Sequence, residues 1–449
     1  LEAGDRVGGR LYTVTPDGSD VPAELGGIAV RSTDALVTGV ADRLELAREP
    51  LAGGDPADLL YLRGRRFRGD QWSERGVVPY RLGPAERGRT PEQILAAAVA
   101  AVVPDAATLD AAGWAAAKPH LRYAGRPLTD LGLWDVLRAL VSEDAFALLE
   151  DAGAFRPQFQ NWNAADAFAD LSAGWRQGVR YERLRDGYES LARALARAAA
   201  DAGASISSGR RVTSVEAETT FVLHVDGAAD VSARAVVLAL PHIALRELIA
   251  RSPLAGDEGL ARDLDAVTAV PLFHCFLAYA EPWWEQLGIH HGRSSTDLPV
   301  QSCFYFDGGL LMVGYSTPAA IEFWDRYLPD RPDKAHPVTP PPAMVGELSR
   351  QLAELHDLAV PEPEWMTLMD WRPPPFGGAS HRWRVGARSW EVIPRVRARR
   401  PDLPLYVCGE AYSDDQGWVE GALQTAELVV RDHFDVDQPD WLRPGPAPR

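Results

Sequence analysis

The stretch LEAGDRVGGR, residues 1–10, decides the fold class because it joins a strand end to a glycine-rich loop. Leu1 and Glu2 are typical of the end of a buried strand, and three glycines follow among charged residues. Dinucleotide-binding folds use an acidic residue at such a strand end to hold a ribose hydroxyl. In those folds a glycine-rich turn comes before this strand, whereas the sequence here starts at the strand end itself.

A second nucleotide-type element lies near the other end of the chain, in LYVCGEAYSDDQGWVEGAL, residues 405–423. The pattern predicts a strand, a glycine-rich loop and a helix. A helix N-terminus offers free N–H groups and a positive dipole end, and glycine lets the backbone approach a ligand closely. One such loop is weak evidence by itself, but the acidic strand end at residue 2 strengthens it.

Composition bounds the class of protein. The chain has 449 residues, enough for two or three domains, and 46% of them are hydrophobic. Its formal net charge of −17 argues against a nucleic-acid groove. Three scattered cysteines predict neither a disulfide framework nor a structural zinc site, so we expect no metal and favour a cytoplasmic location. No apolar run is long enough to span a membrane.

Local patterns predict a split arrangement. Residues 90–202 are mostly helical in pattern, and RTPEQ at 89–93 predicts a helix start with a capping box. ARAVVLALP, residues 233–241, is typical of a buried parallel strand. VQSCFYFDGGLLMVGY, residues 300–315, predicts a hairpin. Nucleotide-type elements therefore alternate with a helical insert and a strand-rich insert.

These motifs resemble those of a known family. LEAGDRVGGR and GEAYSDDQGWVEGAL are similar to the second-strand loop and the C-terminal FAD motif of the flavin amine oxidases. WWEQLGIHHGRSSTDLP, residues 283–299, is similar to a segment of the L-amino-acid oxidase branch, and ELGGIAV and GYESL also fit. The resemblance covers nearly the whole chain in the right order. That family begins with a GxGxxG unit, so we expect a chain truncated before the second strand, or a second chain that supplies the unit.

The fold class that the resemblance implies is α/β, with a discontinuous FAD-binding Rossmann-like domain that lacks its first βα unit, a helical domain and a strand-rich substrate-binding domain. The expected boundaries are 1–45, 203–265 and 396–435 for the FAD-binding domain, 46–89 and 266–395 for the substrate domain, 90–202 for the helical domain and 436–449 for a tail.

The resemblance also implies a set of cofactor-binding residues. Some would lie along the ribose and pyrophosphate of FAD, and others would lie near the adenine, the ribityl chain or the isoalloxazine ring. The set is Glu2, Arg6, Gly9, Arg10, Gly26, Gly27, Ile28, Val212, Trp371, Gly409, Glu410, Gly417, Trp418 and Val419. For Trp371 a plain core role is an equal alternative.

On the substrate side, the resemblance implies roles for Tyr315, Trp418, His274 and Arg31. Tyr315 lies where the family places a carboxylate-binding tyrosine, and His274 lies where many members carry a lysine that holds a water. Ala29 and Gln301 stand where the amino-acid oxidases carry arginines, so Arg31 is the cation that could substitute. Arginine is the best carboxylate partner because its planar fork binds both oxygens.

The function implied is FAD-dependent oxidative deamination of an L-amino acid to the imino or keto acid with release of hydrogen peroxide. The partners are a small amino acid or amine and dioxygen, with no nucleic acid, no membrane span and a possible homodimer. Two alternatives stay open: an FAD-dependent oxidase of an amine without a carboxylate, and a non-catalytic relative or fragment that does not retain FAD.

Overall fold

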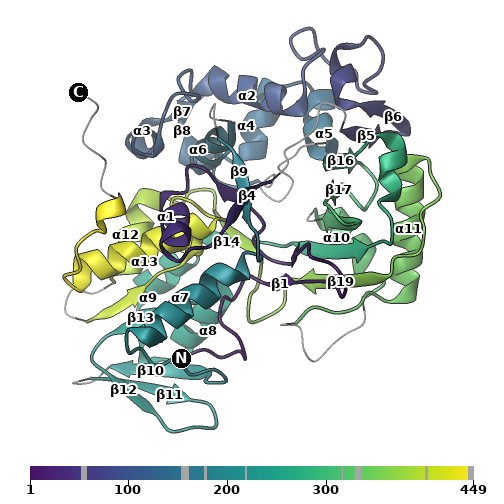
Figure 1. The fold of residues 1–449 in the computed structure, drawn as a ribbon. Coiled ribbons are helices and arrows are strands. Elements are labelled where there is room, and N and C mark those ends of the chain that lie inside the picture. Colours follow the sequence, from purple (N-terminus) through teal and green to yellow (C-terminus); the bar gives the residue numbers. More distant parts are fainter. Residues whose placement is uncertain are drawn as a thin grey trace, which may run out of the picture.

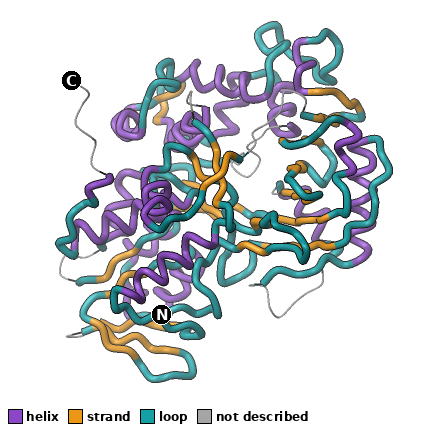
Figure 2. Tube along the Cα trace, viewed as in Figure 1, coloured by secondary structure: helices purple, strands orange, loops and turns teal. Residues whose placement is uncertain are grey.

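The computed structural model describes residues 1–51, 58–152, 161–175, 179–217, 220–315, 317–328, 336–399 and 403–442 (Figures 1 and 2). The expected tail at 436–449 therefore lies partly outside the described residues. Within the described chain, no helix combines the length and apolar character needed to cross a membrane.

A short parallel sheet joins the middle of the chain to its C-terminal part. Strand β13 (Val236–Leu238) pairs in parallel with β21 (Leu405–Val407), which confirms the strand predicted within 233–241. The strand predicted to end at Glu2 is not confirmed, because Leu1 and Glu2 lie in irregular backbone. The N–H of Glu2 donates to Ser207 O at 2.9 Å, and the N–H groups of Arg210 and Gly209 donate to Glu2 O and Gly4 O, each at 2.8 Å. These three bonds do not form a regular strand ladder.

An antiparallel sheet and several helices surround this pair. The sheet, at the bottom of Figure 1, has the order β10 (Val212–Ala217), β11 (Phe221–Val225) and β12 (Val231–Ala233). The helices are α1 (Ala35–Arg43), α7 (Glu189–Asp201), α8 (His242–Ala250), α9 (Glu258–Leu264), α12 (Ser389–Arg397) and α13 (Val419–His433). Figure 1 shows α1 and α13, from opposite ends of the chain, side by side, and the Glu420 carboxylate accepts hydrogen bonds from the N–H groups of Leu36 and Val37.

A helical layer covers the top of the molecule (Figures 1 and 2). It contains α2 (Pro91–Val102), α3 (Ala111–Ala117), α4 (Leu133–Leu140), α5 (Glu143–Ala152) and α6 (Ala164–Trp175), with the small hairpin β7 (Arg122–Tyr123) and β8 (Arg126–Pro127). The capping box is confirmed, because Thr90 Oγ1 accepts from the N–H of Gln93 and the Gln93 side chain accepts from the N–H of Thr90.

The largest sheet holds seven of the described strands in the order β19-β15-β18-β17-β16-β5-β6. Their bounds are β5 (Leu59–Leu62), β6 (Arg65–Arg68), β15 (Phe273–Ala278), β16 (Gly292–Thr296), β17 (Ser302–Tyr305), β18 (Leu310–Tyr315) and β19 (Trp365–Asp370). β17 and β18 form the predicted hairpin. Helices α10 (Pro318–Asp325) and α11 (Pro342–His356) pack on this sheet through buried Ile321, Leu348 and Leu352.

Small sheets link these parts. β3 (Val30–Arg31), β9 (Tyr181–Leu184) and β4 (Arg48–Pro50) form one of them, and β1 (Thr13–Val14) pairs with β2 (Ala23–Glu24) in another. β14 (Val267–Val270) pairs with β20 (Ser380–Trp383). The described 3₁₀ turns are Gly69–Ser73, Lys118–His120, Leu128–Asp130, Pro253–Gly256, Trp283–Leu287, Glu410–Tyr412 and Asp440–Leu442.

Candidate active site

The N-terminal glycine loop is shaped by its own arginine. Arg6 Nη1 donates to Leu11 O at 2.8 Å, Nη2 donates to Gly9 O, and the guanidinium stacks over the Tyr12 ring at 3.8 Å. Gly9 has a φ of 54°, and a Cβ built on it would meet no atom within 4 Å. The loop therefore presents an open, left-handed backbone position to which a ligand could approach closely.

Arg10 fastens this loop to the segment that contains Gly26, Gly27 and Ile28. The carbonyl of Arg10 accepts from the N–H of Gly27 at 3.2 Å. A Cβ on Gly26 would lie 1.9 Å from the same carbonyl oxygen, so only glycine fits there. The two predicted flavin-binding segments at residues 6–10 and 26–28 are thus joined through backbone contact.

The Arg10 side chain also reaches the C-terminal motif. Its Nη1 donates to Glu410 Oε1 at 2.5 Å, and His381 Nδ1 lies 2.6 Å from the same oxygen. The N–H of Gly417 donates to Glu410 Oε2 at 2.9 Å. Burial alone would raise the pKa of Glu410, but the charges and hydrogen bonds of Arg10 and His381 hold it well below its ordinary range. This cluster, Arg10–His381–Glu410–Gly417, ties both ends of the chain together.

The N-terminus of α13 fits a ligand that carries hydrogen-bond acceptors. Trp418 is the residue before the helix, and its side chain makes no capping bond, so Trp418 itself offers no acceptor to the first-turn N–H groups. Gly409 has a φ of 135°, and a Cβ placed on it would meet only Leu240 O, at 3.8 Å. Open backbone at residues 9 and 409 and a positive helix end suit the acceptor-rich parts of FAD.

Two predicted site residues contact the carbonyl oxygen of Leu25. Trp371 Nε1 donates to it at 2.6 Å, and His274 Nδ1 lies 3.1 Å from it. Trp371 is also packed edge-on against Phe376, so it belongs to a core cluster as well. Burial lowers the pKa of His274 to about 4, so its imidazole is neutral near pH 7.

Arg31 is held by protein carboxylates. Its Nε donates to Asp34 Oδ1 at 2.7 Å, its Nη2 donates to Asp415, and its guanidinium lies over the Trp418 ring at 4.1 Å. Burial alone would lower the pKa of Arg31, but the charges of Asp415 and Asp34 raise it above its ordinary value. The structure thus joins Arg31 to Trp418 but gives its guanidinium two anions already.

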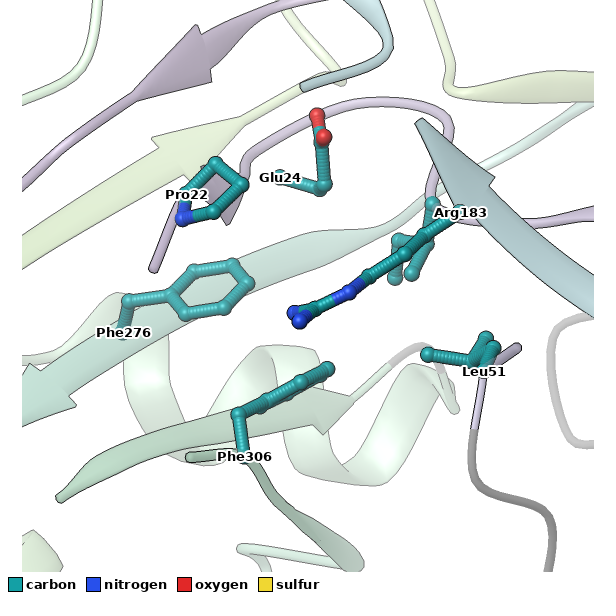
Figure 3. A pocket seen from close by; sticks show the side chains of 7 residues that line it. Pro22, Glu24, Leu51, Arg183, Phe276 and Phe306 are labelled. Atoms are coloured by element: carbon teal, nitrogen blue, oxygen red, sulfur yellow. The ribbon is translucent and has the colours of Figure 1, made fainter. Parts of the chain in front are cut away.

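A pocket opens beside Ile28 (Figure 3). The space between its lining atoms is about 270 Å³, which includes open solvent. Its walls are mainly apolar and include one carboxyl and one guanidinium group; they are formed by Pro22, Glu24, Ile28, Leu51, Arg183, Phe276 and Phe306. Phe276 lies two residues from His274 on β15, so the pocket adjoins the strand that carries a predicted catalytic residue.

Glu24 is the acidic group of this pocket. Its Oε2 accepts from Thr13 Oγ1 at 2.8 Å, and its Oε1 accepts from the N–H of Tyr188 at 2.7 Å. Burial raises the pKa of Glu24 to about 7 in spite of these bonds. Its two oxygens therefore fix the side chain of Thr13 and the backbone of Tyr188, and its charge varies near neutral pH.

The remaining predicted residues are more dispersed. Glu2 Oε1 accepts from the N–H of Gly4 at 2.7 Å, and Val212 starts β10 opposite Val225. Tyr315 ends β18 opposite Phe273, and its side chain lies outside the described part of the structure. Gln301, the position where an arginine was expected, donates to Thr317 Oγ1 at 2.6 Å and so fixes a loop.

Sequence reasoning missed Glu24, Arg183, Phe276, Phe306 and the carboxylate partners of Arg31. A signal existed for Glu24, which precedes the Gly-Gly turn of ELGGIAV. Arg183 carried no such signal, because YERL is a short mixed strand. Its place in the pocket comes from the pairing of Arg183 with Glu49 across β9 and β4, 134 residues apart in the chain.

Comparison with known proteins gives consistent results. A family model described as flavin containing amine oxidoreductase matches residues 1–432. Aplysianin-A from Aplysia kurodai is 25% identical over 96% of this chain and 84% of that protein, and the L-amino-acid oxidase of Mus musculus is 28% identical over 98% and 68%.

Solved structures show the same mixed α/β fold. Wild-type putrescine oxidase bound to putrescine superimposes with a TM-score of 0.71 at 17% identity, covering 97% of this chain and 93% of that chain. The family match spans nearly the whole sequence, and the residues at both ends of the chain suit an acceptor-rich cofactor. The chain belongs to the flavin-containing amine oxidoreductases, enzymes whose cofactor is FAD.

Proposed function

We propose that this protein catalyses the FAD-dependent oxidative deamination of an L-amino acid, with dioxygen as the final electron acceptor. The products would be hydrogen peroxide and the imino acid, which water hydrolyses to the keto acid and ammonia. The observation that carries the proposal is the pocket beside Ile28, because it combines apolar walls with a guanidinium group. Such a pocket can hold the apolar part of an amino acid and balance its carboxylate.

The chain's own residues would divide the work of cofactor binding. FAD, when bound, supplies the acceptor for the hydride from the amine-bearing carbon. Arg10, through the backbone contact with Gly26 and Gly27, would place that segment against the ring. The uncapped N-terminus of α13 would hold acceptor atoms at the opposite edge, and Gly9 and Gly409 would lie close to the rest of the cofactor.

Other residues would prepare the substrate. His274 is buried and neutral near pH 7, so it adds no positive charge that would repel an ammonium group. Phe276, Phe306 and Ile28 would exclude water from the reacting carbon, which protects the imine and strengthens local electrostatics. Tyr181 stacks on Trp418, with ring centroids 6.3 Å apart, and would form the adjoining wall.

The test is a substrate panel on the full-length protein purified with bound FAD. Hydrogen peroxide, ammonia and keto acid would be measured with L-amino acids, their D enantiomers and the corresponding decarboxylated amines. We expect the three products in equal amounts from L-amino acids with apolar side chains. Absence of peroxide with every substrate, in a preparation that contains oxidised flavin, would refute the proposal.

A second candidate is an oxidase of amines that lack the carboxylate. The observation in its favour is Glu24, an acidic group in the same pocket that could attract an ammonium group when ionised. The fold likeness to putrescine oxidase agrees with this candidate but shows the fold alone. In the same panel, this candidate predicts that the decarboxylated amines are oxidised faster than the amino acids.

A further inference from the structure

We propose that Arg183 is the residue that binds the substrate carboxylate and so makes the enzyme select amino acids over simple amines. The inference rests on the proposed function and adds to it a specificity-determining residue. The family resemblance pointed to Arg31 for this role, and the geometry points to a different strand. Three properties of Arg183 support the assignment: its location, the state of its charge and the face of β9 from which it projects.

Arg183 lies where a substrate would be held. It lines the pocket beside Ile28 together with Phe276 and Phe306. Figure 3 shows its side chain reaching across the pocket, with the guanidinium end directed toward the space between the two phenylalanine rings. An anion in this pocket would therefore meet the planar face or fork of a guanidinium on one side and apolar walls elsewhere.

The charge of Arg183 is only loosely compensated by the protein. Its Nη2 lies 3.4 Å from Glu49 Oε2 and 3.8 Å from Asp307 Oδ2. Those carboxylates are exposed by 31% and 60%, and such pairs contribute little. Glu49 has a closer partner in Arg185, at 2.6 Å. Among the residues that the structure describes, Nε and Nη1 of Arg183 have no hydrogen-bond acceptor.

Arg31 differs in each respect. Its side chain is 7% exposed and bonds to Asp34 and Asp415 at both ends of the guanidinium. A substrate carboxylate near Arg31 would meet these two aspartates as well, and like charges in a buried site repel strongly. Arg183 has spare donors and a weakly paired charge in a pocket, whereas two close aspartates already balance the charge of Arg31.

The strand geometry aims Arg183 toward the predicted flavin side. Successive side chains of a strand alternate between faces, so Tyr181 and Arg183 share one face of β9. Tyr181 stacks on Trp418, the residue at the N-terminus of α13, with an interplanar angle of 28°. A carboxylate bound at Arg183 would thus leave the rest of the substrate near the wall formed by Tyr181, Trp418 and Ile28.

Glu24 does not compete strongly for Arg183. Both of its oxygens accept hydrogen bonds from other groups, Thr13 and the backbone of Tyr188. In Figure 3 its carboxyl group points away from the guanidinium. Burial also raises the pKa of Glu24 to about 7, so a large share of the molecules carry it uncharged near neutrality. A substrate carboxylate would be the stronger anion for Arg183.

The test compares three variants of the flavin-loaded enzyme. Arg183→Met keeps the length and apolar stem but removes the charge, and Arg183→Lys keeps a charge without the bidentate fork. Arg185→Met is the matched control, since this neighbour on the same chain segment also pairs with Glu49 but is 63% exposed. Peroxide release would be measured with an L-amino acid and with its decarboxylated amine.

We expect Arg183→Met to lower kcat/KM for the amino acid about 100-fold, mainly through KM, and to change kcat/KM for the amine by less than about 3-fold. Arg183→Lys should fall between wild type and Arg183→Met, and Arg185→Met should behave like wild type. An equal loss for both substrates, or no loss for either, would overturn the assignment of Arg183.

A binding measurement separates this inference from the proposed function. Benzoate, a carboxylate without an amine, would be titrated by calorimetry into the same proteins. The inference predicts binding to wild type and Arg185→Met and a loss of about 100-fold in Arg183→Met. If wild type oxidises neither substrate class but this benzoate pattern holds, the proposed function fails and the carboxylate site stands. Equal benzoate affinity in wild type and Arg183→Met would overturn the carboxylate site whatever the activity.

Discussion

The cluster around Glu410 and the pocket around Arg183 differ in how closely their charged side chains are paired. In the cluster, Glu410 is 6% exposed and receives Arg10, His381 and the Gly417 N–H within 2.9 Å. In the pocket, the distances from Arg183 to its carboxylate partners are 3.4 and 3.8 Å, and the partners face solvent. The first region pairs its charges closely within the protein, and the second holds a guanidinium that is paired only at long distance.

The closeness of charge pairing distinguishes residues that hold the structure of a site from residues that can bind a ligand. A buried charge with several close partners has little affinity left for a ligand, and its removal exposes its partners to a desolvation cost. A pocket arginine with long, solvent-screened ion pairs can change partners at small cost. By this criterion Glu410 and Arg31 hold the backbone in place, and Arg183 is available to a substrate.

The largest effect should come from breaking the cluster. Replacing Arg10 with Met leaves Glu410 buried with one fewer cation, and loss of one partner of a buried pair costs about 3–5 kcal/mol. Because the Arg10 side chain is 20% exposed, we expect a loss of about 3 kcal/mol from the free energy of unfolding. The measurement is urea unfolding of the full-length protein with saturating FAD.

A double-mutant cycle provides the control for Arg10. Arg10→Met combined with Glu410→Gln removes the uncompensated charge, so the double variant should be less destabilised than the sum of the two single variants. Additive losses would mean that the two side chains do not interact in solution and that the cluster does not join the two ends of the chain.

An intermediate effect is expected at Arg31. Arg31→Met leaves Asp34 and Asp415 facing each other without their shared cation, at a cost of about 2 kcal/mol in the free energy of unfolding, since Asp415 is partly solvated. The ratio of kcat/KM for an amino acid to that for its decarboxylated amine should change by less than about 3-fold, because Arg31 is occupied by protein carboxylates. Unfolding in urea and the peroxide assay supply the two measurements.

Arg31 also offers a direct way to contradict the comparison. A tenfold or larger fall in that ratio, with stability preserved, would make Arg31 the carboxylate-binding residue that the sequence predicts. The variant Asp415→Asn is informative beside it, since it should weaken the loop before α13 without altering the ratio.

Local features of the fold could be predicted from the sequence, and long-range pairings could not. Thr90 and Gln93 stand three residues apart, so their capping box depends only on neighbours. The hairpin of β17 and β18 depends on one glycine turn. Leu1 and Glu2, by contrast, have the composition of a strand end, but the segment that bonds to residues 2–4 lies far along the chain, at residues 207–210, and forms no regular ladder with them.

In the candidate site, too, contiguous motifs could be predicted and long-range pairings could not. The motifs at residues 6–10, 26–28 and 409–419 are contiguous, so resemblance could identify them. The state of each charge depends on residues far along the chain: Asp415 is 384 residues from Arg31, and Arg183 enters the pocket through pairing with β3 and β4. A sequence pattern shows that an arginine is present, but the fold decides whether its charge is available.

The last effect is a pH dependence at Glu24, the acidic group of the Arg183 pocket. Burial raises the pKa of Glu24 from its ordinary 4.5 to about 7. Between these values the folded protein keeps a proton that the unfolded chain releases, so this group makes stability fall as pH rises from about 4.5 to 7. The slope from one such group is at most about 1.4 kcal/mol per pH unit.

Glu24→Gln should remove this slope. The free energy of unfolding of the variant would fall less than that of wild type as pH rises from 4.5 to 7, and the pH of maximum stability would move upward. His274 cannot explain such a change, because its pKa is lowered to about 4 and it therefore makes stability rise with pH between about 4 and 6.5. Urea unfolding at half-unit pH intervals is the measurement, with Glu362→Gln, an exposed carboxyl, as the matched control. Parallel pH profiles for wild type and Glu24→Gln would mean that Glu24 is ionised throughout this range, and Arg183 would then have a full negative charge beside it before any substrate binds.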